Sequence, residues 1–193
     1  MLHNFSKSLH HEREQAAKAD NFYRDVLKVS EIRRFNSDTE ADMEMQLQDV
    51  DLLITFNDLT YKVSEKFRDK DYDDLYVEVY SKYPKTLGWL HTGSPNAILY
   101  FTPNTVYWIT HKSLKEFCLE KLFPLIQGKW WEEQFLSHKS FVSKSIVLNN
   151  KVFKINLIQA HNRDGADWET FGISAPFSVF EENGVKIKKY IYG

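Results

Sequence analysis

The stretch from Asp49 to Ser81 carries acidic side chains and a lysine at positions where they could do chemistry. Asp51 stands at the start of an apolar segment, Lys66 follows fifteen positions later directly after Glu65, and Glu78 lies further on. Carboxylates that meet around a divalent cation, with a lysine beside them, are suited to hydrolysis by a metal-activated water. These residue types therefore predict a metal-dependent hydrolase core, provided that the fold brings Asp51 and the acid–lysine pair together.

A β-hairpin is the element that would bring them together. From Val50 to Phe56, apolar residues alternate with others at a period of two, which places Asp51 on the less apolar side of a half-buried strand. Asn57–Asp58 is a turn signal, because both side chains bond nearby backbone and tolerate left-handed conformations. The extended segment that restarts at Tyr61 then runs antiparallel to the first strand and returns the acid–lysine pair to Asp51.

Further elements flank this hairpin. A third strand is predicted over Leu75–Val79, which alternates again and carries Glu78 on its more polar face. On the N-terminal side, a run of N-cap formers followed by helix-favouring residues predicts a short helix that leads into the first strand. Glu40 and Glu44 lie four positions apart on that helix and share a face, so one of them could point towards Asp51.

Helices and strands are also expected outside this centre. Residues 9–30 show a helical spacing of apolar positions, and Ser113 caps the clearest helical pattern of the chain, which stops at Pro124. After Ser140 β-rich runs predominate, and Asn149–Asn150 separates two of them as a hairpin turn would. The further predicted strands are 106–110, 145–148, 152–158 and 185–192.

Composition narrows the class of protein. With 193 residues, of which 42% are hydrophobic and 27% charged, the chain can bury one good core and is not expected to be disordered. A net charge of −2 gives no overall attraction to nucleic acid, so DNA binding would depend on local basic groups. Cys118 is the only cysteine, which excludes an intrachain disulfide and a thiolate zinc site. We expect a cytoplasmic protein with no membrane partner, since neither a membrane span nor a signal peptide is evident.

The order of these elements resembles the PD-(D/E)XK nuclease superfamily, over roughly residues 30–125. In that family a helix with a glutamate precedes a strand with an aspartate, and a hairpin leads to an acid, any residue and a lysine. Asp51 matches the aspartate and Lys66 the lysine, and Glu44 or Glu40 matches the helix glutamate. The resemblance implies an α/β (α+β) protein with the restriction-endonuclease-like fold, in which helices flank a mixed central sheet.

The resemblance also implies Mg²⁺-dependent hydrolysis of DNA phosphodiester bonds. Carboxylates would hold Mg²⁺ or Mn²⁺, which prefer oxygen ligands: Asp51 with Glu65 or Glu78, and Glu44 in support. Lys66 would orient or deprotonate the attacking water and offset phosphate charge. Arg68 would hold a neighbouring phosphate through its fork of donors. DNA is therefore the expected partner, and a homodimer is compatible with this interpretation.

The sequence departs from the family's motif at Ser64, which stands two residues before the lysine where the motif has its acid. The acid present is Glu65, and on a regular strand its side chain points away from that of Lys66. Either a β-bulge re-aims Glu65, or Glu78 on a neighbouring strand supplies the missing carboxylate. In a third interpretation the protein keeps the fold, has lost the chemistry and serves as a binding or interaction protein.

The predicted organisation is a single domain in two regions. Residues 1–125 would form the nuclease-like α/β core with its N-terminal helix. Residues 126–193 would form a β-rich extension of the same domain, because strand-like runs predominate there.

Overall fold

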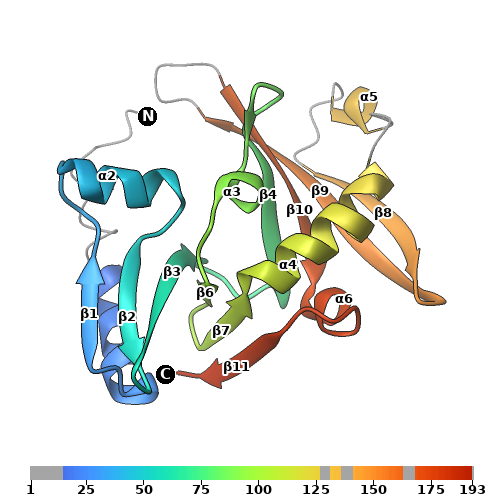
Figure 1. Ribbon diagram of the computed structural model, residues 1–193. Helices are drawn as coiled ribbons and strands as arrows, with labels where there is room; N and C mark the ends of the chain where they lie inside the picture. Colours follow the sequence, from blue (N-terminus) through green and yellow to red (C-terminus); the bar gives the residue numbers. More distant parts are fainter. Residues whose placement is uncertain (1–14, 127–130, 136–140, 163–167, 193) are drawn as a thin grey trace. The chain divides into compact units, whose positions relative to one another are not determined.

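The computed structural model describes residues 15–126, 131–135, 141–162 and 168–192, which form a protein of mixed α and β structure with two sheets (Figure 1). This confirms the predicted class at the level of mixed α and β structure. The chain divides into two compact units that interleave along the sequence. The first comprises residues 1–71, 94–109 and 188–193, and the second comprises 72–93 and 110–187.

The first unit is built on a six-stranded sheet whose strands lie side by side in the order in which they occur along the chain, although the strands of the second sheet intervene in the sequence. In spatial order its strands are β1 (Glu31–Arg34), β2 (Leu52–Phe56), β3 (Leu59–Phe67), β6 (Ala97–Phe101), β7 (Thr105–Thr110) and β11 (Ile187–Ile191). β2 is antiparallel to β1 and β3, whereas β3 and β6 are parallel. The central strand β3 therefore ends at the same edge of the sheet as β6.

The predicted hairpin forms β2 and β3. Asn57 and Asp58 adopt φ of +49° and +61°, the left-handed pair that a tight hairpin turn requires. Leu52 and Ile54 are fully buried while Leu53 is partly exposed, so the alternation predicted for this strand is confirmed. The register pairs Leu52 with Val63, which brings the chain just before β2 alongside the second half of β3.

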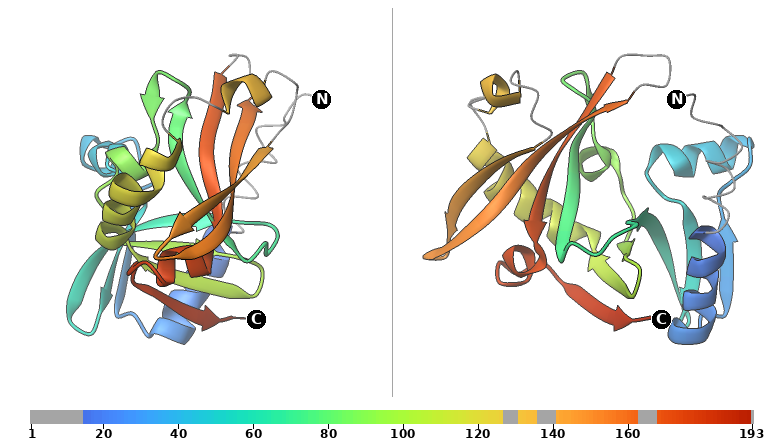
Figure 2. Two further views of the ribbon diagram at one scale, coloured as in Figure 1. Left: turned by 90° about the vertical axis from the view of Figure 1, so that its right-hand side faces the viewer. Right: turned by 180° about the vertical axis from the view of Figure 1, so that it is seen from behind.

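A helix covers one face of this sheet (Figure 2). Residues 15–22 are α-helical and continue into the π-helical turn η1 (Tyr23–Leu27), while the start of the predicted helix at residue 9 lies outside the described residues. The side chains that this helix buries against β2, β3 and β6 are Ala19, Phe22, Tyr23 and Leu27. Burial of large apolar side chains, each contributing about 1.5–3 kcal/mol, holds the helix on the sheet.

The short helix α2 (Glu40–Leu47) precedes β2, as predicted. Thr39 caps it, since the Thr39 side chain accepts a hydrogen bond from the Asp42 N–H. Asp42 in turn accepts the Ser37 hydroxyl at 2.6 Å, which fixes the approach to the helix. After α2 the backbone turns at Asp49, whose φ of +55° is left-handed, and enters β2.

The second unit is built on a five-stranded antiparallel sheet. In spatial order its strands are β5 (Thr86–Leu87), β4 (Asp74–Lys82), β10 (Trp168–Pro176), β9 (Lys151–Asn162) and β8 (Phe141–Leu148). Asn149 and Asn150 form the predicted β8–β9 turn with φ of +50° and +62°. Aromatic side chains fill the core here, with Trp131 stacked on Phe171 at 4.2 Å between ring centroids.

The helical segments of the second unit are α3 (Trp89–Thr92), α4 (His111–Phe117), η2 (Cys118–Leu122), η3 (Phe123–Ile126), α5 (Glu132–Phe135) and α6 (Phe177–Glu181). The predicted cap at Ser113 was wrong: α4 begins at His111, and the Ser113 hydroxyl donates to the Thr110 carbonyl inside the first turn. The helical path also continues past Pro124, which sits in η3. None of the helices in the described part of the chain is long and apolar enough to span a membrane.

Candidate functional site

Asp51 lies one residue before β2 and is bonded to the backbone of β3. Its N–H donates to the Val63 carbonyl at 2.9 Å, and its carboxylate accepts the Glu65 N–H at 2.6 Å. The Asp51 carboxylate thus accepts the β3 N–H that a backbone carbonyl would accept if β2 were longer. The hairpin brings Asp51 beside the acid–lysine pair, as the sequence predicts.

Lys66 is paired with an aspartate that the sequence analysis did not single out. The Lys66 amine donates to Asp49 Oδ1 at 2.8 Å, and the Ser64 hydroxyl donates to Asp49 Oδ2 at 2.7 Å. Ser64 and Lys66 are alternate residues of β3 and share a face of the strand, so one carboxylate can bind both. Asp49 therefore supplies an acid next to Ser64, where the family's motif carries its own acid.

Glu65 is engaged elsewhere. Its carboxylate accepts two hydrogen bonds from the Arg34 guanidinium, at 2.7 and 3.1 Å, and one from the Tyr23 hydroxyl at 2.8 Å. Asp20 binds the same guanidinium at 2.7 Å. The Glu65 side chain is only 6% exposed and that of Arg34 20%. This ion-pair network joins the helix, β1 and β3, which is a structural role.

The interpretation that a bulge re-aims Glu65 was wrong. β3 runs in unbroken register against β6 from Val63 to Phe67, so its side chains alternate regularly. The different partners of Glu65 and Lys66 agree with that alternation.

The electrostatic environment of Asp51 disfavours its negative charge. Burial raises the pKa of Asp51 above its ordinary value and the Asp49 carboxylate adds to the rise, whereas Lys66 and Arg34 oppose it. Burial likewise raises the pKa of Glu65, although Arg34 opposes that rise. Around β3, the carboxylates of Asp20, Asp49, Asp51 and Glu65 face the cations of Arg34 and Lys66. When all are ionised, this group carries an excess of negative charge.

The remaining predicted residues lie on other elements. Glu44 and Glu40 are exposed on α2. Glu78 lies on β4, whose bonded neighbours are β5 and β10, so the interpretation of that strand as a neighbour of β3 was wrong. Arg68 directly follows β3, and its N–H donates to the Phe101 carbonyl at 2.8 Å. The roles in metal and phosphate binding predicted for Glu78, Glu44 and Arg68 remain predictions.

The donor set at Asp49 and Asp51 suits a hard divalent cation. Among the described residues, no three His, Cys, Asp or Glu side chains are grouped as a fully protein-bound metal ion would require. Mg²⁺ rarely needs such a group, because one or two carboxylates hold it together with waters and substrate oxygens. Asp49 and Asp51 lie two residues apart and both accept hydrogen bonds from residues 64–66 of β3, an arrangement that fits this mode of binding.

Comparisons with known proteins do not assign the chain to a family. No protein-family model, no curated protein and no solved structure matches it. What the protein does must therefore be inferred from its own residues.

Proposed function

We propose that this protein hydrolyses phosphodiester bonds of DNA with Mg²⁺ or Mn²⁺, as a nuclease of the restriction-endonuclease-like kind. The observation that carries the proposal is the pairing of Lys66 with Asp49 on the strand that Asp51 borders. A lysine and two carboxylates are thereby gathered on the hairpin where the sequence resembles the nuclease motif. In this proposal Asp49 supplies the carboxylate that the nuclease motif carries at the position of Ser64.

Charge supports the proposal. The group around β3 holds four carboxylates and two cations in a partly buried setting, with the side chains of Asp49 and Lys66 only 20% and 24% exposed. An uncompensated buried negative charge is costly, and the raised pKa of Asp51 reflects that cost. A divalent cation held by Asp49 and Asp51 would offset this charge, and perturbed pKa values of this kind cluster at functional sites.

In the proposed reaction, Asp49 and Asp51 would hold the cation. When bound, the cation lowers the pKa of a coordinated water and draws charge from the phosphate. Lys66, which Asp49 fixes at 2.8 Å, then places its ammonium against a phosphate oxygen and stabilises the negative charge that develops there. Ser64 keeps the Asp49 carboxylate oriented through its own hydrogen bond.

Glu65 becomes a positioning residue in this account. Its bonds to Arg34 and Tyr23 fix the segment of β3 that carries Ser64 and Lys66. The Glu65 N–H also holds the Asp51 carboxylate through the 2.6 Å bond, so the strand and the acid are fixed together. Rigid placement of this kind is what catalytic groups require.

A second candidate function is a binding or interaction protein that uses the same fold without catalysis. One observation favours it: both oxygens of Asp49 are already bonded within the chain, to Lys66 and Ser64. Such a cluster can be purely structural, since ion-pair networks without a catalytic role also perturb pKa values. A plasmid-nicking assay separates the two functions.

The test is nicking of supercoiled plasmid by the purified chain in Mg²⁺, Mn²⁺ or EDTA. We expect nicking that requires the metal and falls at least about 100-fold in Lys66→Ala, the usual minimum for loss of an acid–base or charge-stabilising group. Lys62→Ala is the matched control, because Lys62 lies four residues before Lys66 on β3, so that both side chains point to the same face of the strand. Absence of nicking by the folded wild-type chain, or equal nicking by Lys66→Ala, would favour the binding protein.

A further inference from the structure

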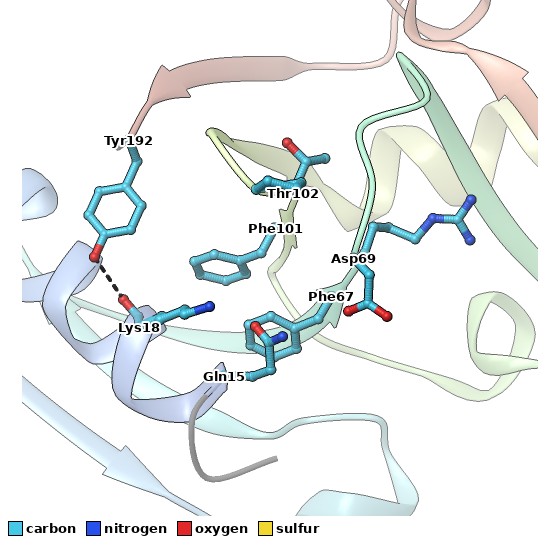
Figure 3. A pocket seen from close by; sticks show the side chains of 9 residues that line it. Gln15, Lys18, Phe67, Asp69, Phe101, Thr102 and Tyr192 are labelled. Carbon is cyan, nitrogen blue, oxygen red and sulfur yellow. Dashed lines mark hydrogen bonds between the residues drawn. The ribbon is translucent and has the colours of Figure 1, made fainter. Parts of the chain in front are cut away.

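A small cavity opens at the edge of the first unit where β3 and β6 end (Figure 3). It has a volume of about 290 Å³. Its lining includes side chains of the helix, of the strand ends and of the C-terminal segment: Gln15, Lys18, Phe67, Asp69, Phe101 and Tyr192. The carboxyl ends of parallel strands are a common location for ligands in α/β proteins.

Stacked rings form the apolar part of the cavity. Phe67 and Phe101 are the last residues of the two parallel strands, and their rings stack with centroids 4.9 Å apart and planes 20° apart. Phe101 is almost fully buried, whereas Phe67 remains partly exposed and can accept another planar group on its surface. Tyr192 is held in place because its hydroxyl donates to the Lys18 carbonyl at 3.2 Å.

A lysine amine supplies the recognition group for an anion. Figure 3 shows the Lys18 side chain extending from the helix towards the rings of Phe101 and Phe67. Lys18 is exposed, and within the described part of the chain no bonding partner of its amine is found. The Asp69 carboxylate and the Gln15 amide, which also line the cavity, can accept hydrogen bonds from hydroxyl and amino groups.

From these contacts we infer that the cavity binds an unpaired nucleotide. The Phe67 ring would stack with the base, Lys18 would bind the phosphate, and Asp69 or Gln15 would accept from sugar or base donors. The volume lies just below the roughly 300–1,000 Å³ typical of ligand pockets, so one nucleotide rather than a base pair fits the space. Neither Asp49 nor Lys66 lines the cavity, and the inference does not rest on the proposed hydrolysis.

The nucleotide could come from a free mononucleotide or from a single strand of nucleic acid. Fluorescence anisotropy of a labelled oligothymidylate tests the strand, and competition by thymidine 5′-phosphate or thymidine tests the free nucleotide and its phosphate. EDTA in the buffer keeps binding separate from any hydrolysis. Ionic strength is held at about 0.1 M, since the contribution of Lys18 is screened by salt.

We expect binding that weakens about tenfold in Lys18→Ala, the usual loss for one hydrogen bond to a charged group, and that Lys18→Arg largely restores. Arg24→Ala is the matched control, because Arg24 is an exposed cation of the same helical run that does not line the cavity. It should change affinity less than about twofold. Competition by thymidine 5′-phosphate would identify a free nucleotide, and its failure would identify the strand. No binding at millimolar concentration, or equal losses in Lys18→Ala and Arg24→Ala, would overturn the inference.

Discussion

Replacement of Asp51 by asparagine should stabilise the fold while abolishing hydrolysis. The asparagine oxygen can still accept the Glu65 N–H that Asp51 now accepts at 2.6 Å. The substitution removes a charge that burial and the Asp49 carboxylate disfavour, at the cost of the attraction of that charge to Lys66 and Arg34. Because the pKa of Asp51 is raised, the unfavourable contributions outweigh the favourable ones at neutral pH.

The sign and size of the effect follow from proton linkage. A carboxyl group whose pKa is raised on folding contributes stability that is fully present below its unfolded-state pKa and is lost as the pH rises through the folded-state value. The wild-type chain therefore loses this stability as the pH rises above the ordinary carboxyl pKa of about 4, whereas Asp51→Asn does not. We expect a gain in the free energy of unfolding of about 1 kcal/mol at pH 7, which lies within the range of a single stabilising substitution.

Urea denaturation at about pH 4 and pH 7 measures the gain, which should be near zero at the lower pH. Asp58→Asn serves as the control, because Asp58 is an exposed turn residue whose left-handed backbone asparagine also tolerates. It should change stability by less than about 0.5 kcal/mol at either pH. Loss of stability in Asp51→Asn at pH 7, or a gain that does not depend on pH, would refute the reasoning about the charge of Asp51.

Three further predictions concern a buried ion pair, a close contact at a glycine and a hairpin turn. Arg34→Leu should lower the free energy of unfolding by about 3 kcal/mol and Glu65→Gln by about 1 kcal/mol, since only Arg34→Leu leaves a buried carboxylate without its cation. Equal losses for the two variants in urea denaturation would contradict this expectation. Gly172→Ala should cost about 2 kcal/mol, because a Cβ there would lie 2.4 Å from the Tyr76 ring, and an unchanged melting temperature would disprove the clash. Asn150→Gly should add about 0.5 kcal/mol, because its φ of +62° suits glycine, and a lower melting temperature would contradict that assignment of the turn.

The elements that the sequence predicts well depend on local signals. The β2–β3 hairpin has an alternating burial pattern at the start of β2 and a two-residue turn at Asn57–Asp58, and the cap at Thr39 fixes the start of α2. β10 and α6 were not predicted, and the pairing of β4 with β10 joins Tyr76 to Ser174, almost a hundred residues further on. Pairings at such separation leave no periodic pattern in a single sequence, so the sheet order could not be predicted.

In the candidate site too, contacts within one hairpin could be predicted from the sequence, whereas contacts between distant segments could not. The hairpin register brings Asp51 to Glu65, which the sequence predicts, because both residues lie on one hairpin. Asp49 was missed because it stands in a left-handed turn between a helix and a strand, outside both periodic patterns. The position of Asp49 two residues before Asp51 was the signal in the sequence that could have identified it. Arg34 was missed as the partner of Glu65 because the contact spans 31 positions.

The most direct test of the account compares two isosteric variants, Asp49→Asn and Glu65→Gln, in the plasmid-nicking assay with Mg²⁺. If Asp49 binds the metal and Glu65 only positions β3, Asp49→Asn abolishes nicking, while Glu65→Gln, once shown to be folded, retains most of it. Loss of nicking in Glu65→Gln with full activity in Asp49→Asn would contradict these roles.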